Sequence, residues 1–232
     1  MSNVDLKVDF CEHKAAEYAV KHWHYSKSMP AGKLVKCGVW ENDKFIGCVL
    51  FGRGGTYTIG EPYGLEQVEC CELVRVALNK HLSPTSQIVS LSIKLLKKES
   101  PGLRLIVSYA DSKEGHNGTI YQAMNWIYEG GSVDSRIIVR GILKHRRSLT
   151  STYGTNSLEW LRAHVDHEAE RVIMPPKYKY LYPLDRAMRK QIAPLAKPYP
   201  KRETCGQGVE GDTSGVQPEG AGSIPADRSD LG

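Results

Sequence analysis

The order of apolar and polar residues predicts alternating helices and strands. Within residues 13–25 the apolar positions recur every three or four residues, which predicts a helix with one face on the core. Ser83-Pro84 provides a cap and a first-turn proline for a second helix, which Pro101-Gly102 ends. The apolar positions of the two helices are Ala16, Ala19, Val20 and Trp23, then Ile88, Leu91, Leu95 and Leu96.

Shorter apolar runs predict strands. They cover residues 4–10, 34–40, 45–51, 70–78 and 103–109, and two closing strands follow, one from Tyr128 and one over 136–143. A short helix is expected over 119–126. The resulting order, β-α-β-β-β-α-β-α-β-β, indicates one mixed α/β domain.

Charge and composition divide the chain into three parts. Residues 203–232 are acidic and rich in Gly, Ser and Pro, so we expect a disordered tail. Residues 171–202 hold nine Lys or Arg and one acid, which predicts a basic arm rich in Tyr and Pro. Residues 1–170 then form the main domain. The whole chain carries +5 and residues 1–200 carry +8, which favours an anionic partner.

Signals of membrane insertion and export are missing from the sequence. No apolar run is long enough to span a membrane, and Asp5, Lys7 and Asp9 interrupt any apolar signal region. The six cysteines form neither a CxxC pair nor a zinc-ribbon spacing, which is typical of reduced thiols. We therefore expect a cytoplasmic protein.

The segment His22-Trp23-His24-Tyr25-Ser26 is the first candidate site. On the helical register Trp23 faces the core, while His24 and Tyr25 turn away from it. Polar aromatic groups held at the end of an element are typical of active sites. The alternative is a solvated helix C-terminus, where the helix dipole favours histidine.

Asp111 is the second candidate, because it ends the apolar strand. Ligands of open α/β sheets bind beyond the carboxyl ends of the strands. Glu114 and His116 follow within five residues, which is compatible with metal binding or proton transfer. Alternatively, Asp111 is a turn or cap residue.

Arg75 lies inside an apolar strand, where a guanidinium needs an anionic partner. Strand periodicity places it on the face opposite Glu72, so its partner must come from elsewhere. That partner is either a carboxylate in a structural ion pair or a group on a substrate.

Two basic segments are candidates for nucleic-acid binding. Phosphate contacts beside aromatic stacking surfaces suit a nucleic acid with an unpaired base, although basic runs also occur as solvated surface. In an extended backbone the lysines and tyrosines of the second segment lie on opposite faces. The candidates are Arg140, Lys144, Arg146 and Arg147 in the first segment, and Lys177, Tyr178, Lys179 and Tyr180 in the second.

Five motifs occur in order along residues 1–200: HWHYS, CELVRVAL, SYADSKEGH, GTIYQAMNW and MPPKYKYLYPL. Together they resemble the Mom family of DNA-modification proteins from Mu-like bacteriophages. The resemblance implies an enzyme that converts adenine in double-stranded DNA to N6-carbamoylmethyladenine in the host bacterial cell, shielding phage DNA from restriction. It also implies the fold of the GCN5-related N-acetyltransferases, a mixed central sheet with helices on both faces.

One segment departs from the acetyltransferase pattern. Those enzymes bind the pyrophosphate of acetyl-CoA with a glycine-rich loop after the central strand, whereas residues 79–85 read NKHLSPT, without glycine. This argues against acetyl-CoA as the donor. A charged glycyl-tRNA is an alternative donor, since a basic surface would also bind it.

The resemblance also implies a set of functional residues. It points to His24, Tyr25, Arg75 and Asp111, and to a bound iron for which His24, Tyr25 and Asp111 offer suitable ligands. Tyr121 is placed like the tyrosine general acid of many acetyltransferases, and His22 and His116 are reserves. Two other functions stay open, an acyltransferase acting on a small amine and a non-catalytic nucleic-acid-binding protein.

Overall fold

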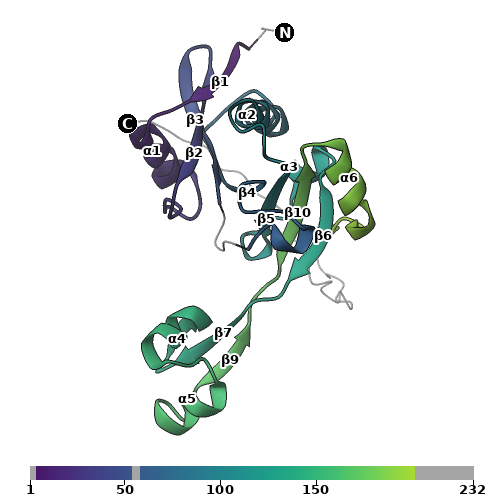
Figure 1. Cartoon of the computed structure of the whole chain (residues 1–232). Helices are drawn as coiled ribbons and strands as arrows, with labels where there is room; N and C mark the ends of the chain where they lie inside the picture. Colours follow the sequence, from purple (N-terminus) through teal and green to yellow (C-terminus); the bar gives the residue numbers. More distant parts are fainter. Residues whose placement is uncertain (1–3, 54–57, 202–232) are drawn as a thin grey trace, which may run out of the picture. The chain divides into compact units, whose positions relative to one another are not determined.

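A seven-stranded sheet forms the centre of the fold (Figure 1). The computed structural model describes residues 4–53 and 58–201, so the acidic tail expected at 203–232 lies outside the described residues. All neighbouring strands are antiparallel except β4 and β5, which are parallel. In spatial order the strands are β1 (Leu6–Phe10), β2 (Leu34–Glu41), β3 (Lys44–Gly52), β4 (Cys70–Leu78), β5 (Leu105–Asp111), β10 (Lys177–Pro183) and β6 (Ile127–Ser132).

The two longest helices cover opposite faces of this sheet. Successive residues of a strand point to opposite faces. On β3, Leu50 shares a buried cluster with Val20 of α1 (His13–Trp23), whereas Phe51 shares another with Ile88 of α2 (Thr85–Glu99). The predicted mixed α/β sheet with helices on both faces is therefore confirmed.

The basic arm expected at 171–202 is wrong, because its central part is an inner strand. β10 pairs with β5 on one side and with β6 on the other. Its lysines and tyrosines do alternate between faces as predicted, but the tyrosine face is packed into the core. Tyr180 is fully buried. The centroid of its ring lies 5.0 Å from that of Tyr121 and 5.3 Å from that of Tyr128. Residues 1–201 consequently form one compact unit.

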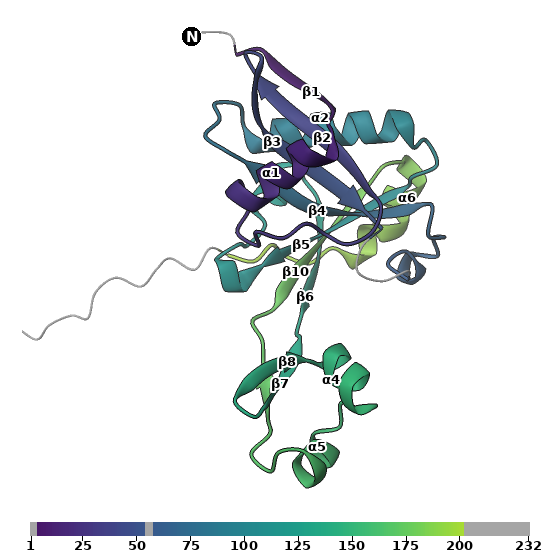
Figure 2. The same cartoon turned by 90° about the vertical axis from the view of Figure 1, so that its left-hand side faces the viewer.

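The second closing strand expected at 136–143 is also different in the structure. It is a hairpin of β7 (Ser135–Val139) and β8 (Ile142–His145) that belongs to a separate three-stranded sheet with β9 (Glu170–Ile173). With α4 (Arg146–Tyr153) and α5 (Leu158–His164), these strands make an insertion between β6 and β10 (Figure 2). We call residues 133–176 the inserted module. Its own core contains Ile137, Val139, Leu149, Leu161 and Ala169.

Short elements complete the described part of the chain. They are α3 (Thr119–Ala123), α6 (Arg186–Ile192) and the 3-10 turns η1 (Glu61–Tyr63), η2 (Ser112–Glu114) and η3 (Ala193–Leu195). None of the helices formed by residues 4–53 and 58–201 has the length and apolar character needed to cross a membrane.

Replacing Gly118 by alanine should destabilise the fold strongly. Gly118 has a φ of +80°, and a Cβ built there would overlap the ring of the buried Tyr180. The combined backbone and packing cost is about 2–4 kcal/mol of unfolding free energy. Gly115 is the matched control, since its φ is +71° but a Cβ meets nothing within 4 Å, so Gly115→Ala should cost only about 1 kcal/mol. Urea unfolding measures both, and equal losses would contradict the packing argument.

Candidate functional site

A cavity opens where the two parallel strands separate. β4 and β5 are paired from Cys70 and Leu105 only as far as Leu73 and Ser108. Beyond that point β4 stays with β3 and β5 stays with β10, so a gap remains near the carboxyl end of β5. The cavity has a volume of about 310 Å³. Its lining comprises Tyr25, Ile59, Glu72, Leu73, Val74, Arg75, Tyr109, Asp111, Ser132, Arg147 and Lys177.

Three of the residues predicted from separate motifs meet in this cavity. Tyr25 follows α1, Arg75 lies on β4, and Asp111 ends β5. Figure 1 shows β4 and β5 as neighbours in the sheet, with α1 on the sheet beside β2 and β3. The structure therefore brings these three residues together, and their functional roles stay predictions.

A bulge in β4 changes the prediction for Arg75. Leu50 of β3 is opposite Arg75 while the next residue, Phe51, is opposite Leu73, so Val74 is the extra residue. The bulge shifts the alternation by one position, and Glu72 and Arg75 both line the cavity. The expectation that they lie on opposite faces is therefore wrong. Glu72 was missed as a site residue because regular alternation hides it.

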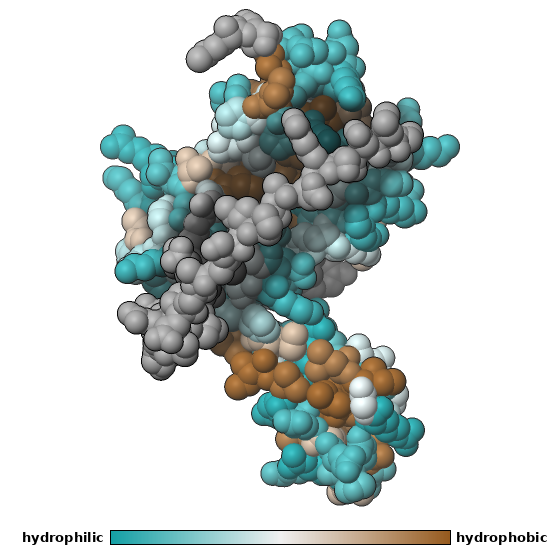
Figure 3. All heavy atoms as spheres, turned by 180° about the vertical axis from the view of Figure 1, so that it is seen from behind, coloured by the Kyte–Doolittle hydropathy of each residue, from teal (hydrophilic) through white to brown (hydrophobic). Residues whose placement is uncertain are grey.

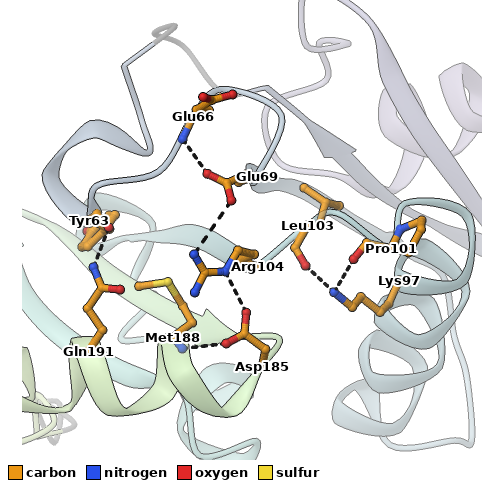
Figure 4. A network of polar contacts seen from close by, with 10 residues as sticks. All are labelled: Tyr63, Glu66, Glu69, Lys97, Pro101, Leu103, Arg104, Asp185, Met188 and Gln191. Carbon is orange, nitrogen blue, oxygen red and sulfur yellow. Dashed lines mark hydrogen bonds and ion pairs between the residues drawn. The ribbon is translucent and has the colours of Figure 1, made fainter.

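Arg75 differs from an arginine that serves a structural ion pair. Its Nη1 donates to the carbonyl of Val74 at 2.7 Å, and its buried Nε has no hydrogen-bond partner. Among residues 4–53 and 58–201 no carboxylate lies within ion-pair distance of it. Arg104, by contrast, lies between Glu69 and Asp185 (Figure 4). This contrast favours a substrate contact for Arg75 over the structural alternative.

Asp111 combines a structural and a potential chemical role. One carboxylate oxygen accepts a hydrogen bond from the backbone N–H of Lys113 at 3.1 Å, which caps η2. The other lies 3.8 Å from Nζ of Lys177 on the neighbouring strand. The turn-residue alternative is thus correct as far as the cap goes, but the carboxylate also lines the cavity.

His24, Tyr25 and His116 form a row of rings at the cavity. The ring centroids of His24 and Tyr25 are 4.3 Å apart, and those of Tyr25 and His116 are 5.5 Å apart. Tyr25 is 49% exposed, whereas His24 is only 7% exposed. Burial raises the pKa of Tyr25, and the negative charge of Asp111 raises it further. His22 lies apart from this row, since it stacks on Tyr18 and hydrogen-bonds to the Tyr18 carbonyl.

The imidazole of His24 is neutral at physiological pH. Burial, followed by the positive charge of Arg75, lowers the pKa of His24 to about 4. Its Nδ1 accepts the backbone N–H of Ser26 at 3.1 Å and lies 2.8 Å from the hydroxyl of the same residue. A neutral imidazole beside cationic groups is a potential hydrogen-bonding or metal-binding group.

Tyr121 lies behind the cavity. Its phenol donates to Ser108 Oγ at 2.7 Å, and that hydroxyl donates to the carbonyl of Leu73 at 2.8 Å. Burial raises the pKa of Tyr121 to about 12, so the phenol stays protonated. It reaches the point where β4 and β5 separate, but it is not part of the cavity lining.

Two of the residues predicted to bind nucleic acid are used by the fold instead. Lys179 pairs with Glu129 at 2.9 Å and lies over the Tyr63 ring. The hydroxyl of the buried Tyr180 donates to the carbonyl of Asn117. Both predictions are wrong because β10 is an inner strand. Tyr178 is partly buried, with its ring against Tyr128.

The other basic candidates keep accessible side chains. Lys177 and Arg147 line the cavity. Arg140, Arg146 and Arg147 are exposed in the inserted module, and Lys144 lies over the Tyr153 ring.

The loop after β4 does not fit the pyrophosphate of acetyl-CoA. Its backbone N–H groups at Leu82 and Ser83 donate to the carboxylate of Glu41, at 3.0 and 2.7 Å. Glu41 is buried and thus takes the position that a bound anion would need. A carboxylate fixed there would also repel a phosphate group.

The fold and the cavity define a mixed α/β protein with a polar site between two parting parallel strands. Residues 5–201 match the model of the Mom protein family, and the chain therefore belongs to that family. It is 23% identical over 207 residues to the methylcarbamoylase Mom of Escherichia phage Mu, covering 85% of this chain and 84% of the relative. Among solved structures it is similar to FeeM, an N-acyl amino acid synthase from uncultured soil microbes, with a TM-score of 0.44 and 13% identity, covering 83% of this chain and 96% of that one.

Proposed function

We propose that this protein transfers a carbamoylmethyl group to the N6 amine of adenine in double-stranded phage DNA, within the cytoplasm of the host. The observation that carries the proposal is the cavity at the end of β5, where Tyr25, Arg75 and Asp111 meet in a chain of the Mom family. The similar protein of phage Mu is named a methylcarbamoylase. The modified bases would protect the phage genome from restriction.

The cavity suits a base that has been turned out of the duplex. The N6 amine of adenine is paired in the major groove, so chemistry on it requires flipping the base into a pocket. The volume of about 310 Å³ lies at the lower end of small-molecule sites. Tyr25 is half exposed there and offers a ring on which a base can stack.

The polar side chains of the cavity match the chemistry of the N6 amine. Its lone pair is delocalised into the ring, so removal of a proton in the transition state assists the attack. Asp111 would accept that proton as a general base. The Arg75 fork would bind oxygen atoms of the transferred group. Tyr121, with its raised pKa, would act as a general acid through a relay: the Ser108 hydroxyl would turn from the Leu73 carbonyl, give its proton to the leaving oxygen of the carrier and take the Tyr121 proton.

The donor is proposed to be a carrier other than acetyl-CoA, because Glu41 occupies the amides of the loop after β4. Glycyl-tRNA is the candidate that also suits the basic surface. Attack of N6 on its ester carbonyl would release the tRNA hydroxyl and give an N6-glycyl amide, which would then have to rearrange to its isomer, the carbamoylmethyl amine. Purified protein incubated with duplex DNA and either glycyl-tRNA or acetyl-CoA would distinguish the two. Modification with acetyl-CoA alone would contradict this proposal.

Iron is proposed as a cofactor, with His24, Tyr25 and Asp111 as its ligands. In the described residues no three His, Cys, Asp or Glu side chains gather around one point, so the proposed set depends on the tyrosine. Because Nδ1 of His24 accepts the Ser26 N–H at 3.1 Å, metal binding through Nε2 would require this hydrogen bond to break, so that Nδ1 could carry the proton and donate it to Ser26 Oγ. A bound iron would act as a Lewis acid on the transferred group. Metal analysis of the purified protein and of His24→Ala tests this set.

Replacing Arg147 by glutamine should weaken DNA binding in a salt-dependent way. Arg147 is exposed in the inserted module and also lines the cavity, so it can reach a phosphate beside the flipped base. Loss of one phosphate contact should reduce the log-log salt slope of affinity by about 0.9. Lys98→Gln on α2 is the control, because Lys98 is exposed and does not line the cavity. Equal salt slopes for Arg147→Gln and the wild type would show that Arg147 does not contact a DNA phosphate.

Mass spectrometry of nucleosides tests the proposed function as a whole. Plasmid DNA is isolated from cells that express the protein and digested to nucleosides. The expected result is N6-carbamoylmethyladenine in the wild type and unmodified adenine with Arg75→Lys. DNA that stays unmodified with the wild type, or an acylated small amine instead, would overturn the proposal.

A further inference from the structure

The β7–β8 hairpin of the inserted module ends in apolar side chains that the module does not bury. Ile142 is 60% exposed and Leu143 is 40% exposed. Neither belongs to the core of the module, which is formed by other residues of β7, α4 and α5. Figure 3 shows apolar side chains gathered on the surface of this module. Because successive residues of a strand point to opposite faces, Ile142 and Leu143 are exposed on different faces of the hairpin, and Ile142, next to the turn, is the more exposed of the two.

The tip of this hairpin is stiff. Val139 is directly opposite Ile142, so the turn contains only Arg140 and Gly141. Both have positive φ, +51° and +72°, which is the tight two-residue turn that matches the twist of a hairpin. The carboxylate of Asp166 accepts the backbone N–H of Arg140 and holds the turn to the rest of the module. The exposed isoleucine is therefore presented on a rigid support.

The hairpin and the helix after it are basic in sequence, whereas the neighbouring strand β9 places Glu170 opposite Ile138. From Ser135 to Leu158 the sequence contains no Asp or Glu. The cations of this stretch are Arg136, Arg140, Lys144, Arg146 and Arg147. Asp166 is the acid closest to the turn, and it is engaged with the Arg140 backbone. Apolar residues between cations suit a duplex, whose phosphates attract the cations while the base steps admit an apolar wedge.

The tip also lies within reach of the candidate site. Arg147, which lines the cavity, is five residues after Ile142. An extended chain of that length covers no more than about 17 Å. A wedge and a pocket separated by this distance can act on the same base step, since a flipped base leaves the stack while the wedge enters it.

We propose that Ile142 is the residue that enters the DNA stack and fills the gap left by the flipped adenine, with Arg140 and Lys144 on the flanking phosphates. The proposal rests on the proposed function, because it needs an adenine that leaves the duplex. It assigns to the inserted module the task of opening the substrate, while the residues between β4 and β5 carry out the chemistry. An unstacked or mispaired adenine needs no such help.

The test compares Ile142→Ser with the wild type on two substrates. One is a matched duplex, and the other is the same duplex with a mismatch opposite the modified adenine. The expected result is a loss of at least about tenfold on the matched duplex, with less than about a twofold change on the mismatched one. Ile173→Ser is the control, because Ile173 is 73% exposed on β9 of the same sheet and should leave both rates unchanged.

Three outcomes would contradict the proposal that Ile142 enters the DNA stack. Equal losses on both substrates would indicate a catalytic or folding defect, and unchanged rates would exclude a role for Ile142. A change in oligomeric state of Ile142→Ser, seen by light scattering, would assign the surface to a second copy of the chain. A wild type that modifies neither substrate contradicts the proposed function itself, which separates that failure from a failure of the wedge. Fluorescence of 2-aminopurine at the target position reports flipping directly, and it should rise with the wild type but not with Ile142→Ser.

Discussion

Arg75→Lys should reduce adenine modification by about 100-fold or more while leaving the protein folded. Lysine keeps the positive charge but loses the planar fork that binds two oxygen atoms at once. Removal of one preorganised donor at a reacting oxygen costs about 10²–10³ in rate. Because Arg75 has no carboxylate partner among the described residues, its replacement breaks no ion pair of the fold. Modification is measured as the fraction of modified adenosine, and folding by thermal unfolding.

Arg104→Lys is the matched control for this experiment. Arg104 lies between Glu69 and Asp185, and the latter also caps α6 by accepting the backbone N–H of Met188 (Figure 4). Lysine there should lower thermal stability and leave the modification per folded molecule unchanged. The reverse pattern, unfolding by Arg75→Lys and lost activity by Arg104→Lys, would exchange the roles assigned to the two arginines.

The local parts of the site could be predicted from the sequence because each lies at the end of one element. The helical periodicity of apolar residues up to Trp23 predicts that His24 and Tyr25 lie at the end of a helix. The apolar run before Asp111 predicts that Asp111 lies at the end of a strand. In the structure α1 ends at Trp23 and β5 ends at Asp111, each within two residues of the end of the predicted range, which is residue 25 for the helix and 109 for the strand. Their meeting in one cavity follows from the order of the strands in the sheet, which no pattern along the chain reveals.

The predictions that proved wrong depend on pairing between segments that are distant in the sequence. Lys177–Pro183 has the composition of a surface arm, yet it completes the sheet by pairing with strands about 50–70 residues earlier. No local pattern reveals such a partner. The bulge at Val74 is equally hidden, because a bulge is defined by the residue opposite it on the neighbouring strand. Consequently Glu72 was missed, and Lys179 and Tyr180 were assigned to DNA.

Asp111→Asn should separate the structural role of this residue from its chemical role. Asparagine retains a side-chain oxygen that can accept the Lys113 N–H, so the cap of η2 persists and stability should change by less than about 1 kcal/mol. Asparagine cannot accept a proton at physiological pH, and the loss of a general base costs about 10²–10⁴ in rate. Modification should therefore fall by at least about 100-fold, measured on the same plasmid DNA.

Two further substitutions, Asp111→Ala and one at the neighbouring Lys177, test the same assignment. Alanine removes the cap as well as the base, so it should lose both stability and activity, whereas asparagine should lose only activity. Lys177 lies 3.8 Å from the carboxylate, and Lys177→Met should leave modification within about tenfold of the wild type, because a partly exposed ion pair contributes little. If Asp111→Asn retains full activity, the carboxylate is only the cap of a turn. The proton of the N6 amine must then be accepted by another group of the cavity, for which the lining residue Glu72 is the nearest in kind.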